Sequence, residues 1–445
     1  MRIMLWRISV WLLAGLLPVA LLVGSPLQAQ QQCAYLHIDG ATATAIGVLW
    51  SHGFDDDDAQ VAGLARVVTA CRLERVRRLV PDTLASGMRI GNDYSLVFGV
   101  VTAGDAELAS QFLSTLLAEQ SAGEILTDDF VALAVARAAL AADDAEFVYP
   151  GDVLLARARQ HFGRGTAFAR PPAGIASAIA KLTPAMVRKA MRVDVPVRMA
   201  VLGVVDAALI NAIRPLAPTF ATRVRGEFVC ADPRALREMT EDRNDRADSP
   251  YVSAAFALPA DVDRAALAVG VQVATSRAFR RWRMRGMEQQ ARAPFVTWSW
   301  LHADPLLRFC RRGENPARLL PGERPQASVL DEVRATTAEL RALLADLRTV
   351  PPSEAELGLA RAALRSRLGL PGPGQKSAWA SEPATLPGRL QVLLLAAHHG
   401  VDVSKIDNVD ASQVHAAVKL VLNTVRSSWH ALLPGQDNVF GYRRR

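Results

Sequence analysis

Residues 136–140 read Ala-Arg-Ala-Ala-Leu, and the same five residues recur at positions 360–364, an offset of 224 residues. Each copy lies in an alanine- and leucine-rich stretch with an acidic start, at 127–129 in the first copy and at 353–356 in the second. Acidic residues ahead of such a stretch are typical of the first turn of a helix. The sequence therefore predicts two long helices of the same kind, one in each half.

A second match supports an internal duplication. Residues 182–187 correspond to residues 409–414, at the nearly equal offset of 227, and each segment begins an expected helix. A mostly apolar segment typical of a strand follows each helix, at 197–205 and at 427–433. Because the two matches occur in the same order at similar offsets, we expect two similar units rather than a chance likeness of alanine-rich helices.

The rest of the chain indicates an α+β fold. Further strands are expected at 45–50, 95–102, 251–258 and 295–300, where β-branched and aromatic residues gather, and long helices separate them. The chain has 445 residues with 50% hydrophobic content, which is more than one core usually holds. We expect two homologous domains, each an antiparallel or mixed sheet flanked by helices.

The domain boundaries follow from composition. Residues 237–250 are charged and polar and offer little to bury, which is typical of an exposed connection. We therefore expect an N-terminal domain at 33–210, a linker at 211–249 and a C-terminal domain at 250–440.

Residues 1–29 have the pattern of an export signal. Arg2 and Arg7 precede an apolar run from 10 to 23, and small residues lead to an expected cleavage site after Ala29. The run is shorter than the ~20 residues of a membrane span, so we expect cleavage and a periplasmic or secreted protein. The alternative is an uncleaved anchor in the inner membrane, with the chain facing the periplasm and no other membrane contact.

Charge and cysteine content narrow the remaining function classes. Loss of residues 1–29 removes two arginines and lowers the formal charge from +7 to +5, which is too mild to indicate nucleic-acid binding. In an oxidising compartment four cysteines can form up to two disulfides through three alternative pairings, and their spacing is not that of a zinc site. These cysteines are Cys33, Cys71, Cys230 and Cys310.

This order of strands and helices resembles the pitrilysin/insulinase-type zinc metallopeptidase superfamily, especially its bacterial members similar to mitochondrial processing peptidase. Residues 53–66 (Gly-Phe-Asp-Asp-Asp-Asp-Ala-Gln-Val-Ala-Gly-Leu-Ala-Arg) resemble the acidic loop and first helix of that family. Residues 91–95 resemble the strand that follows, residues 182–206 the end of the first domain and residues 353–368 a helix of the second. The resemblance covers nearly the whole mature chain and implies a processing-peptidase-like metallohydrolase fold.

The zinc motif of that superfamily is degenerate in this sequence. Active members carry H-x-x-E-H, in which two histidines bind zinc, the glutamate activates a metal-bound water and a distant glutamate completes the site. The corresponding positions here are Arg66, Thr69 and Ala70. Arginine stays protonated, alanine has no donor atom, and the distant position falls within 138–142, which holds only alanine and leucine. No other H-x-x-E-H or H-E-x-x-H occurs, so we expect neither zinc nor another cofactor.

The substrate-binding residues of active relatives are also replaced. The resemblance implies an arginine and a tyrosine seven residues apart in the second domain, and the corresponding residues are Glu288 and Phe295. The charge is reversed and the hydroxyl is lost. The glycine-rich loop of the family's non-catalytic processing subunit is missing too, because the Gly/Pro-rich segment 369–374 lies in a different part of the second domain.

Three other groups of polar residues admit both a functional and a plainer interpretation. His398 and His399 are adjacent, and neighbouring positions on a helix point in different directions, so a solvated or packed role is favoured over metal binding. The acidic run 55–58 lacks the spacing of a calcium loop, which favours a solvated loop. Arginines within 277–285 favour a packed helix with an exposed arginine face over a lipid-binding segment.

These observations lead to three hypotheses for function. The first is a non-catalytic subunit that forms part of a chamber wall beside a zinc-bearing sister subunit, in a heterodimer that can also hold peptides. The second is a stand-alone structural or binding protein of the same fold, as a homodimer. The third, which we rank last, is a metallopeptidase with unusual ligands drawn from His52, His161 or residues 55–58.

Overall fold

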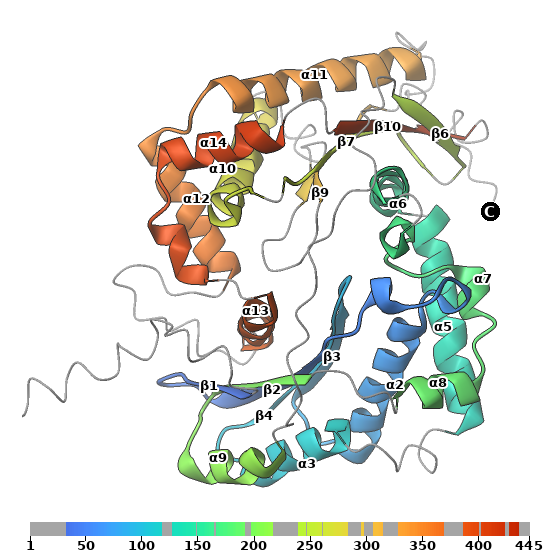
Figure 1. Cartoon of the computed structure of the whole chain (residues 1–445), viewed down its shortest axis with the longest axis vertical. Helices are drawn as coiled ribbons and strands as arrows, with labels where there is room; N and C mark the ends of the chain where they lie inside the picture. The colour runs from blue at the N-terminus through green and yellow to red at the C-terminus, as the bar shows by residue number, and fades with distance from the viewer. Residues whose placement is uncertain are drawn as a thin grey trace, which may run out of the picture.

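The computed structural model contains two five-stranded sheets with the same connectivity (Figure 1). It describes residues 33–117, 127–147, 149–163, 166–191, 197–216, 239–245, 247–259, 261–283, 295–297, 306–314, 328–368, 386–399, 402–422 and 427–435.

The first sheet has the strand order β1-β5-β2-β4-β3. β1 (Cys33–His37) runs parallel to β5 (Val197–Gly203), and the other neighbours are antiparallel. β2 (Ala43–Trp50) pairs along its whole length with β4 (Ser95–Thr102), and β3 (Ala85–Ile90) forms the edge. β2 is buried at every residue, which explains why its sequence is apolar without alternation.

The second sheet repeats the first, strand for strand, in the order β6-β10-β7-β9-β8. β6 (Thr240–Asn244) runs parallel to β10 (Ser427–Pro434), and β10 is antiparallel to β7 (Tyr251–Ala257). β9 (Leu306–Arg312) follows, with β8 (Phe295–Thr297) at the edge. The predicted α+β class, with two mixed sheets flanked by helices, is confirmed.

The helices also correspond between the two halves. The repeated segments 136–140 and 360–364 lie in α5 and α12, and the matched segments 182–187 and 409–414 lead into α8 and α14. The first half contains α2 (Leu64–Leu79), α3 (Ala106–Leu117), α5 (Asp128–Phe147), α6 (Pro150–Phe162), α7 (Ala176–Ile179), α8 (Pro184–Met191) and α9 (Ala207–Ile213). The second contains α10 (Arg264–Arg283), α11 (Val329–Thr349), α12 (Glu354–Arg367), α13 (Leu386–His399) and α14 (Ala411–Val421).

Each sheet is covered on one face by a helix from the other half of the chain. α13 lies against β2, β4 and β5 of the first sheet, and α6 lies against β7 and β10 of the second (Figure 1). Gly47 on β2 permits the close approach of α13, because a Cβ atom there would lie 2.8 Å from Cδ2 of Leu390. The two halves are therefore interlocked through α6 and α13.

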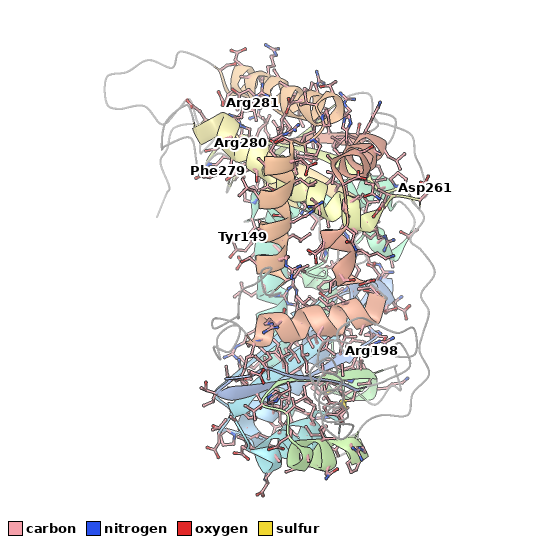
Figure 2. The ribbon with its side chains drawn as sticks, turned by 90° about the vertical axis from the view of Figure 1, so that its left-hand side faces the viewer. Tyr149, Arg198, Asp261, Phe279, Arg280 and Arg281 are labelled. Carbon is pink, nitrogen blue, oxygen red and sulfur yellow. The ribbon has the colours of Figure 1, made fainter. Side chains whose placement is uncertain are left out.

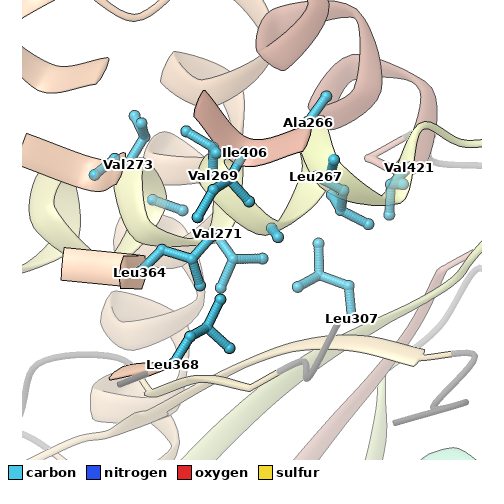
Figure 3. Close-up of a cluster of buried hydrophobic side chains, with 14 of the residues drawn as sticks. Ala266, Leu267, Val269, Val271, Val273, Leu307, Leu364, Leu368, Ile406 and Val421 are labelled. Atoms are coloured by element: carbon cyan, nitrogen blue, oxygen red, sulfur yellow. The ribbon is translucent and has the colours of Figure 1, made fainter. Parts of the chain in front are cut away.

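The opposite sheet faces are covered by helices of their own half. α2 and α3 pack on the first sheet, and α10 and α11 contact strands of the second. Figure 3 shows the core of the second half, where Val271 of α10 lies near Leu364 of α12, and Leu267 of the same helix lies over Leu307 of β9. Full burial of one such aliphatic side chain contributes about 1.5–3 kcal/mol, so this cluster is a main source of stability.

One expectation about residues 237–250 is wrong. We interpreted this stretch as part of an exposed linker, but Thr240–Asn244 form β6. The strand is charged and largely exposed because it is an edge strand held by backbone hydrogen bonds to β10, and hydropathy does not register such a strand. An ion pair of 2.9 Å between Arg157 and Asp242 also ties β6 to α6.

The cysteines in the described ranges do not form the disulfides that we considered. Cys33, Cys71 and Cys310 are buried thiols with no disulfide, and Cys230 lies outside the described residues. Cys33 is in β1, Cys71 in α2 and Cys310 in β9, so the three thiols lie in three different elements. Burial raises the pKa of Cys33 and Cys310 to about 11 and that of Cys71 to about 12.

We expect these three thiols to resist alkylation in the folded protein. The thiolate is the reactive form, and burial both disfavours it and blocks access. Peptide mapping after iodoacetamide treatment at pH 8 should find Cys33, Cys71 and Cys310 unmodified, and fully modified when guanidinium is present. Rapid labelling of any of the three in the native chain would contradict this assignment.

Within the part of the chain that the structure describes, no helix has both the length and the apolar character needed to cross a bilayer. The expected export signal at 1–29 lies outside the described residues.

Candidate functional site

α2 carries the three positions that we matched to the zinc motif in the sequence. Thr69 is fully buried, and its Oγ1 donates a hydrogen bond of 2.6 Å to the carbonyl of Ala65 one turn earlier. Ala70 is half-buried, and Arg66 extends from the first turn of the helix. These positions give the α2 face one guanidinium and one hydroxyl that is hydrogen-bonded to the backbone. Neither group is a usual zinc ligand.

The charges around Arg66 also oppose a metal ion. Burial lowers the pKa of Arg66, and the nearby carboxylate of Asp152 on α6 offsets part of that shift. Burial raises the pKa of Asp152, against the opposing effects of Arg308 on β9 and Arg66. One carboxylate thus faces two arginines, one from each half of the chain. A zinc ion would meet a net positive field there, so these residues do not fit it.

The expected position of a distant glutamate is apolar in the structure. Ala138 and Ala142 lie on α5, are 5% and 1% exposed, and belong to one hydrophobic cluster with Val67 and Val68 of α2. α5 therefore meets α2 through methyl groups. An ionised carboxylate placed there would need a partner to offset its desolvation, and this cluster provides none.

Comparison with solved structures places this architecture among known folds. A peptidase M16 inactive domain from Pseudomonas fluorescens aligns with a TM-score of 0.67 at 13% identity, covering 91% of this chain and 96% of that one. This is the fold of the M16, pitrilysin-type peptidases. The periplasmic protease PqqL from Escherichia coli aligns with a TM-score of 0.57 at 14% identity, covering 91% of this chain and 47% of that one. Pitrilysin aligns with a TM-score of 0.55 at 11% identity, covering 90% and 42% respectively.

Identities this low establish the M16 fold and nothing finer. No protein-family model matches the chain. No curated protein matches it either. The roles of individual residues therefore rest on the geometry of this chain.

The acidic loop before α2 holds one buried carboxylate, that of Asp57, beside an exposed one, that of Asp58. The carboxylate of Asp57 is buried and accepts hydrogen bonds from the backbone N–H groups of Gly63 at 2.8 Å and Ala65 at 3.1 Å. Asp56 accepts a hydrogen bond of 2.8 Å from the N–H of Gly53. Our interpretation as a solvated loop is wrong for Asp57, whose carboxylate satisfies backbone donors at the start of α2, where negative charge is favourable. Asp58 is exposed, as that interpretation expects.

Arg159 joins this loop to α6. Its side chain is 2% exposed, and its Nη2 donates a hydrogen bond of 2.9 Å to Oδ1 of Asp55. Its Nη1 donates to Oδ1 of Asn92 at 2.9 Å, its Nε donates to the carbonyl of Arg170 at 3.0 Å, and its guanidinium lies 3.9 Å from the ring centre of Phe168. The acidic run and the next loop are therefore fixed by one buried cation, a role that the sequence did not indicate.

The residues that correspond to the substrate-binding pair are only partly described. Glu288 lies outside the described residues. Phe295 is the first residue of the edge strand β8 and pairs with Cys310 of β9.

Residues 277–283 of the arginine-rich stretch form the end of α10, and Arg285 lies outside the described residues. Phe279, Arg280 and Arg281 project from this end of the helix (Figure 2). Arg277 differs, because it is 9% exposed and contacts Asp346 of α11 and Glu356 of α12. One member of the expected exposed face is thus an internal anchor.

Of the two histidines considered as unusual ligands, His52 contacts the acidic loop and His161 packs against a phenylalanine. Nε2 of His52 lies 3.5 Å from Oδ1 of Asp57, which the start of α2 already holds. The ring of His161 packs edge-on against Phe162, with centroids 4.8 Å apart. Among the described residues, neither belongs to a group of three potential metal ligands.

Sequence reasoning missed a different cluster. Asp93 lies in the β3–β4 turn, and His398 and His399 end α13, 305 and 306 residues later. One donor atom from each of the three lies within 4.8 Å of the others, the one such group in the described part of the chain. The adjacent histidines at the end of an apolar helix were the one sign of this cluster in the sequence. The sequence does not show that Asp93 is their partner.

Proposed function

We propose that this chain is a non-catalytic M16-type subunit that forms part of a chamber wall and stabilises a zinc-bearing sister subunit in the periplasm. The observation that carries the proposal is the environment of Arg66. An arginine takes the place of a zinc ligand, and a second arginine, Arg308, flanks the same carboxylate of Asp152.

Hydrolysis by the inherited mechanism needs a metal-bound water and a carboxylate that removes its proton. The α2 face has neither group, because Thr69 bonds the backbone of its own helix and Ala70 offers only a methyl group. The cluster at Ala138 and Ala142 is closed to a further ligand by packing. We therefore propose that the chain keeps the architecture of a peptidase half without its chemistry.

Two further observations support a paired assembly outside the cytoplasm. The chain aligns with 47% of PqqL, described as a periplasmic protease, so its length corresponds to about half of that protein. The sequence begins with the pattern of an export signal. A second M16 half is therefore the natural partner, and a lasting interface of this kind would bury more than about 2,000 Å². The alternative is a homodimer of this chain with a structural or binding role.

The proposal predicts inactivity alone and activity in the pair. The mature chain, purified without a tag or chelator, should not hydrolyse a fluorogenic peptide library with or without added zinc. Mixing with an H-x-x-E-H protein from the same genome should give a heterodimer on a sizing column and peptide hydrolysis that a chelator stops.

Matched substitutions in each subunit distinguish the role of the sister subunit from that of this chain. Replacing the motif glutamate of the sister with glutamine should abolish hydrolysis, whereas Arg66→Ala in this chain should leave it within about twofold. Hydrolysis by the isolated chain would refute the proposal. A stable homodimer that does not bind the sister subunit would favour the alternative of a structural or binding role.

A further inference from the structure

α6 and α13, the helices that each cover the sheet of the other half, both contact one turn of the first sheet. Within the turn between β3 and β4, Asn92 accepts a hydrogen bond from Arg159 of α6, and Asp93 receives the last residues of α13. Oδ2 of Asp93 lies 3.3 Å from Nε2 of His398 and 3.7 Å from Nδ1 of His399. The second half of the chain therefore touches the first through a carboxylate and two imidazoles.

All three side chains are withdrawn from water. Their exposed fractions are 5% for Asp93, 7% for His398 and 9% for His399. The ring of Tyr94, which is fully buried, packs edge-on against both imidazoles, with centroids 6.3 Å apart in each case. A buried carboxylate is costly unless a positive charge compensates it, and an aromatic wall holds the imidazoles where that charge would lie.

The spacing of the donor atoms is compatible with a metal site as well as with direct contact between the side chains. Zinc bonds of about 2.0–2.1 Å in a tetrahedron separate neighbouring ligand atoms by about 3.4 Å, whereas an octahedron separates them by about 3.0 Å. The two measured separations, 3.3 and 3.7 Å, lie near the tetrahedral value. Two imidazoles and a carboxylate are also a ligand set that zinc accepts.

The surrounding charges favour a cation. His398 and His399 lie in the last turn of α13, where the helix dipole places partial negative charge. Arg89 of the first half is exposed and hydrogen-bonds Oε1 of Gln391 at 3.2 Å and the hydroxyl of Tyr94, whose ring contacts both imidazoles. Solvent screens this guanidinium, so it opposes a buried ion only weakly.

We propose that Asp93, His398 and His399 bind one zinc ion that fastens α13 to the β3–β4 turn and so clamps the two halves together. Water fills the fourth position of the tetrahedron. The proposed site departs from our expectation that the chain binds no metal. It goes beyond the proposed function and does not depend on it, because it uses none of the three α2 positions Arg66, Thr69 and Ala70 and is tested by binding rather than by hydrolysis.

Zinc titration of the stripped mature chain tests the proposal. After chelator treatment and desalting, calorimetry with zinc chloride should show one equivalent bound, and zinc should raise the melting temperature. Asp93→Asn, and His398→Gln with His399→Gln, should each weaken zinc binding by at least about 100-fold and remove the thermal shift. His415→Gln is the matched control, because His415 lies on α14 and bonds the carbonyl of Arg348 at 2.9 Å.

A measurement on the wild-type chain keeps the test independent of variant folding. Zinc should protect His398 and His399 from diethylpyrocarbonate, read by peptide mapping, while His415 reacts equally with and without the metal. The proposal is overturned if the stripped chain binds no zinc at micromolar concentration. It is also overturned if Asp93→Asn binds as tightly as wild type, which would leave Asp93 and the histidines as an ion pair only.

Discussion

Replacing Arg159 with alanine should lower the free energy of unfolding by about 3–5 kcal/mol, the usual cost of removing one partner of a buried ion pair. The guanidinium is 2% exposed and donates to Asp55, Asn92 and the carbonyl of Arg170. The substitution leaves these acceptors buried without their donor and opens a cavity beside Phe168. Urea unfolding followed by circular dichroism measures the change.

A neighbouring arginine on the same helix provides the control. Arg157 is 43% exposed and pairs with Asp242, so Arg157→Ala should cost less than about 1 kcal/mol. Arg159→Lys should fall between the two, because a single ammonium group cannot reproduce the fork of three donors. Equal effects of Arg157→Ala and Arg159→Ala would show that burial of Arg159 does not stabilise the first half.

Arg277→Ala should destabilise the second half by about 3 kcal/mol, through the same loss of a buried partner. Arg277 donates to both carboxylate oxygens of Glu356, at 3.1 and 2.9 Å, and to the backbone carbonyls of Val350 and Pro351 at 2.8 and 2.9 Å. It also pairs with Asp346 at 3.3 Å. One side chain therefore connects α10 to the end of α11 and the start of α12.

The effect of Arg277→Ala should depend on pH. The hydrogen bond from Arg277 is the main cause that lowers the pKa of Glu356 from 4.5 to about 2 in the folded chain. A carboxylate with a lowered folded pKa stabilises the fold above its unfolded pKa, and this contribution is lost as pH falls through the folded value. The stability gap between wild type and Arg277→Ala should therefore narrow between pH 5 and about 2.

Arg280→Ala serves as the matched control for this prediction. Arg280 also pairs with Glu356 but is 59% exposed, so its loss should cost under about 1 kcal/mol. Thermal unfolding at several pH values separates the two variants. A gap between wild type and Arg277→Ala that stays constant from pH 6 to pH 3 would contradict the assigned role of Glu356.

Five strands that face a core could be predicted from the sequence, whereas the buried strand β9 was not among those expected. β4 runs over the expected residues 95–102, and β2, β5, β7 and β10 differ from expectation by one or two residues at their ends, because their buried apolar runs are continuous. β6 could not be predicted, because its charged side chains are exposed and only its backbone is paired. Burial leaves a sequence signal, and backbone pairing at a sheet edge leaves almost none.

The candidate sites differ in the same way. The arginine at position 66 could be read from the sequence, because it is part of a local motif, but its neighbours Asp152 and Arg308 could not. The approach of His398 and His399 to Asp93 could not, because adjacent helical positions diverge on average and the partner lies about 300 residues earlier. The anchoring role of Arg159 was equally hidden, since buried arginines are identified by their acceptors rather than by their neighbours in sequence.

The reciprocal packing of α6 and α13 bears on how such a chain could have arisen. A single copy of the repeated unit would leave one sheet face bare, with residues such as Leu49 and Leu96 exposed to water. Two identical copies could cover each other by trading that helix across a two-fold axis, as domain-swapped dimers do. On this view the chain corresponds to two copies of an ancestral unit joined into one polypeptide. We therefore expect that neither half is stable when it is expressed without the other.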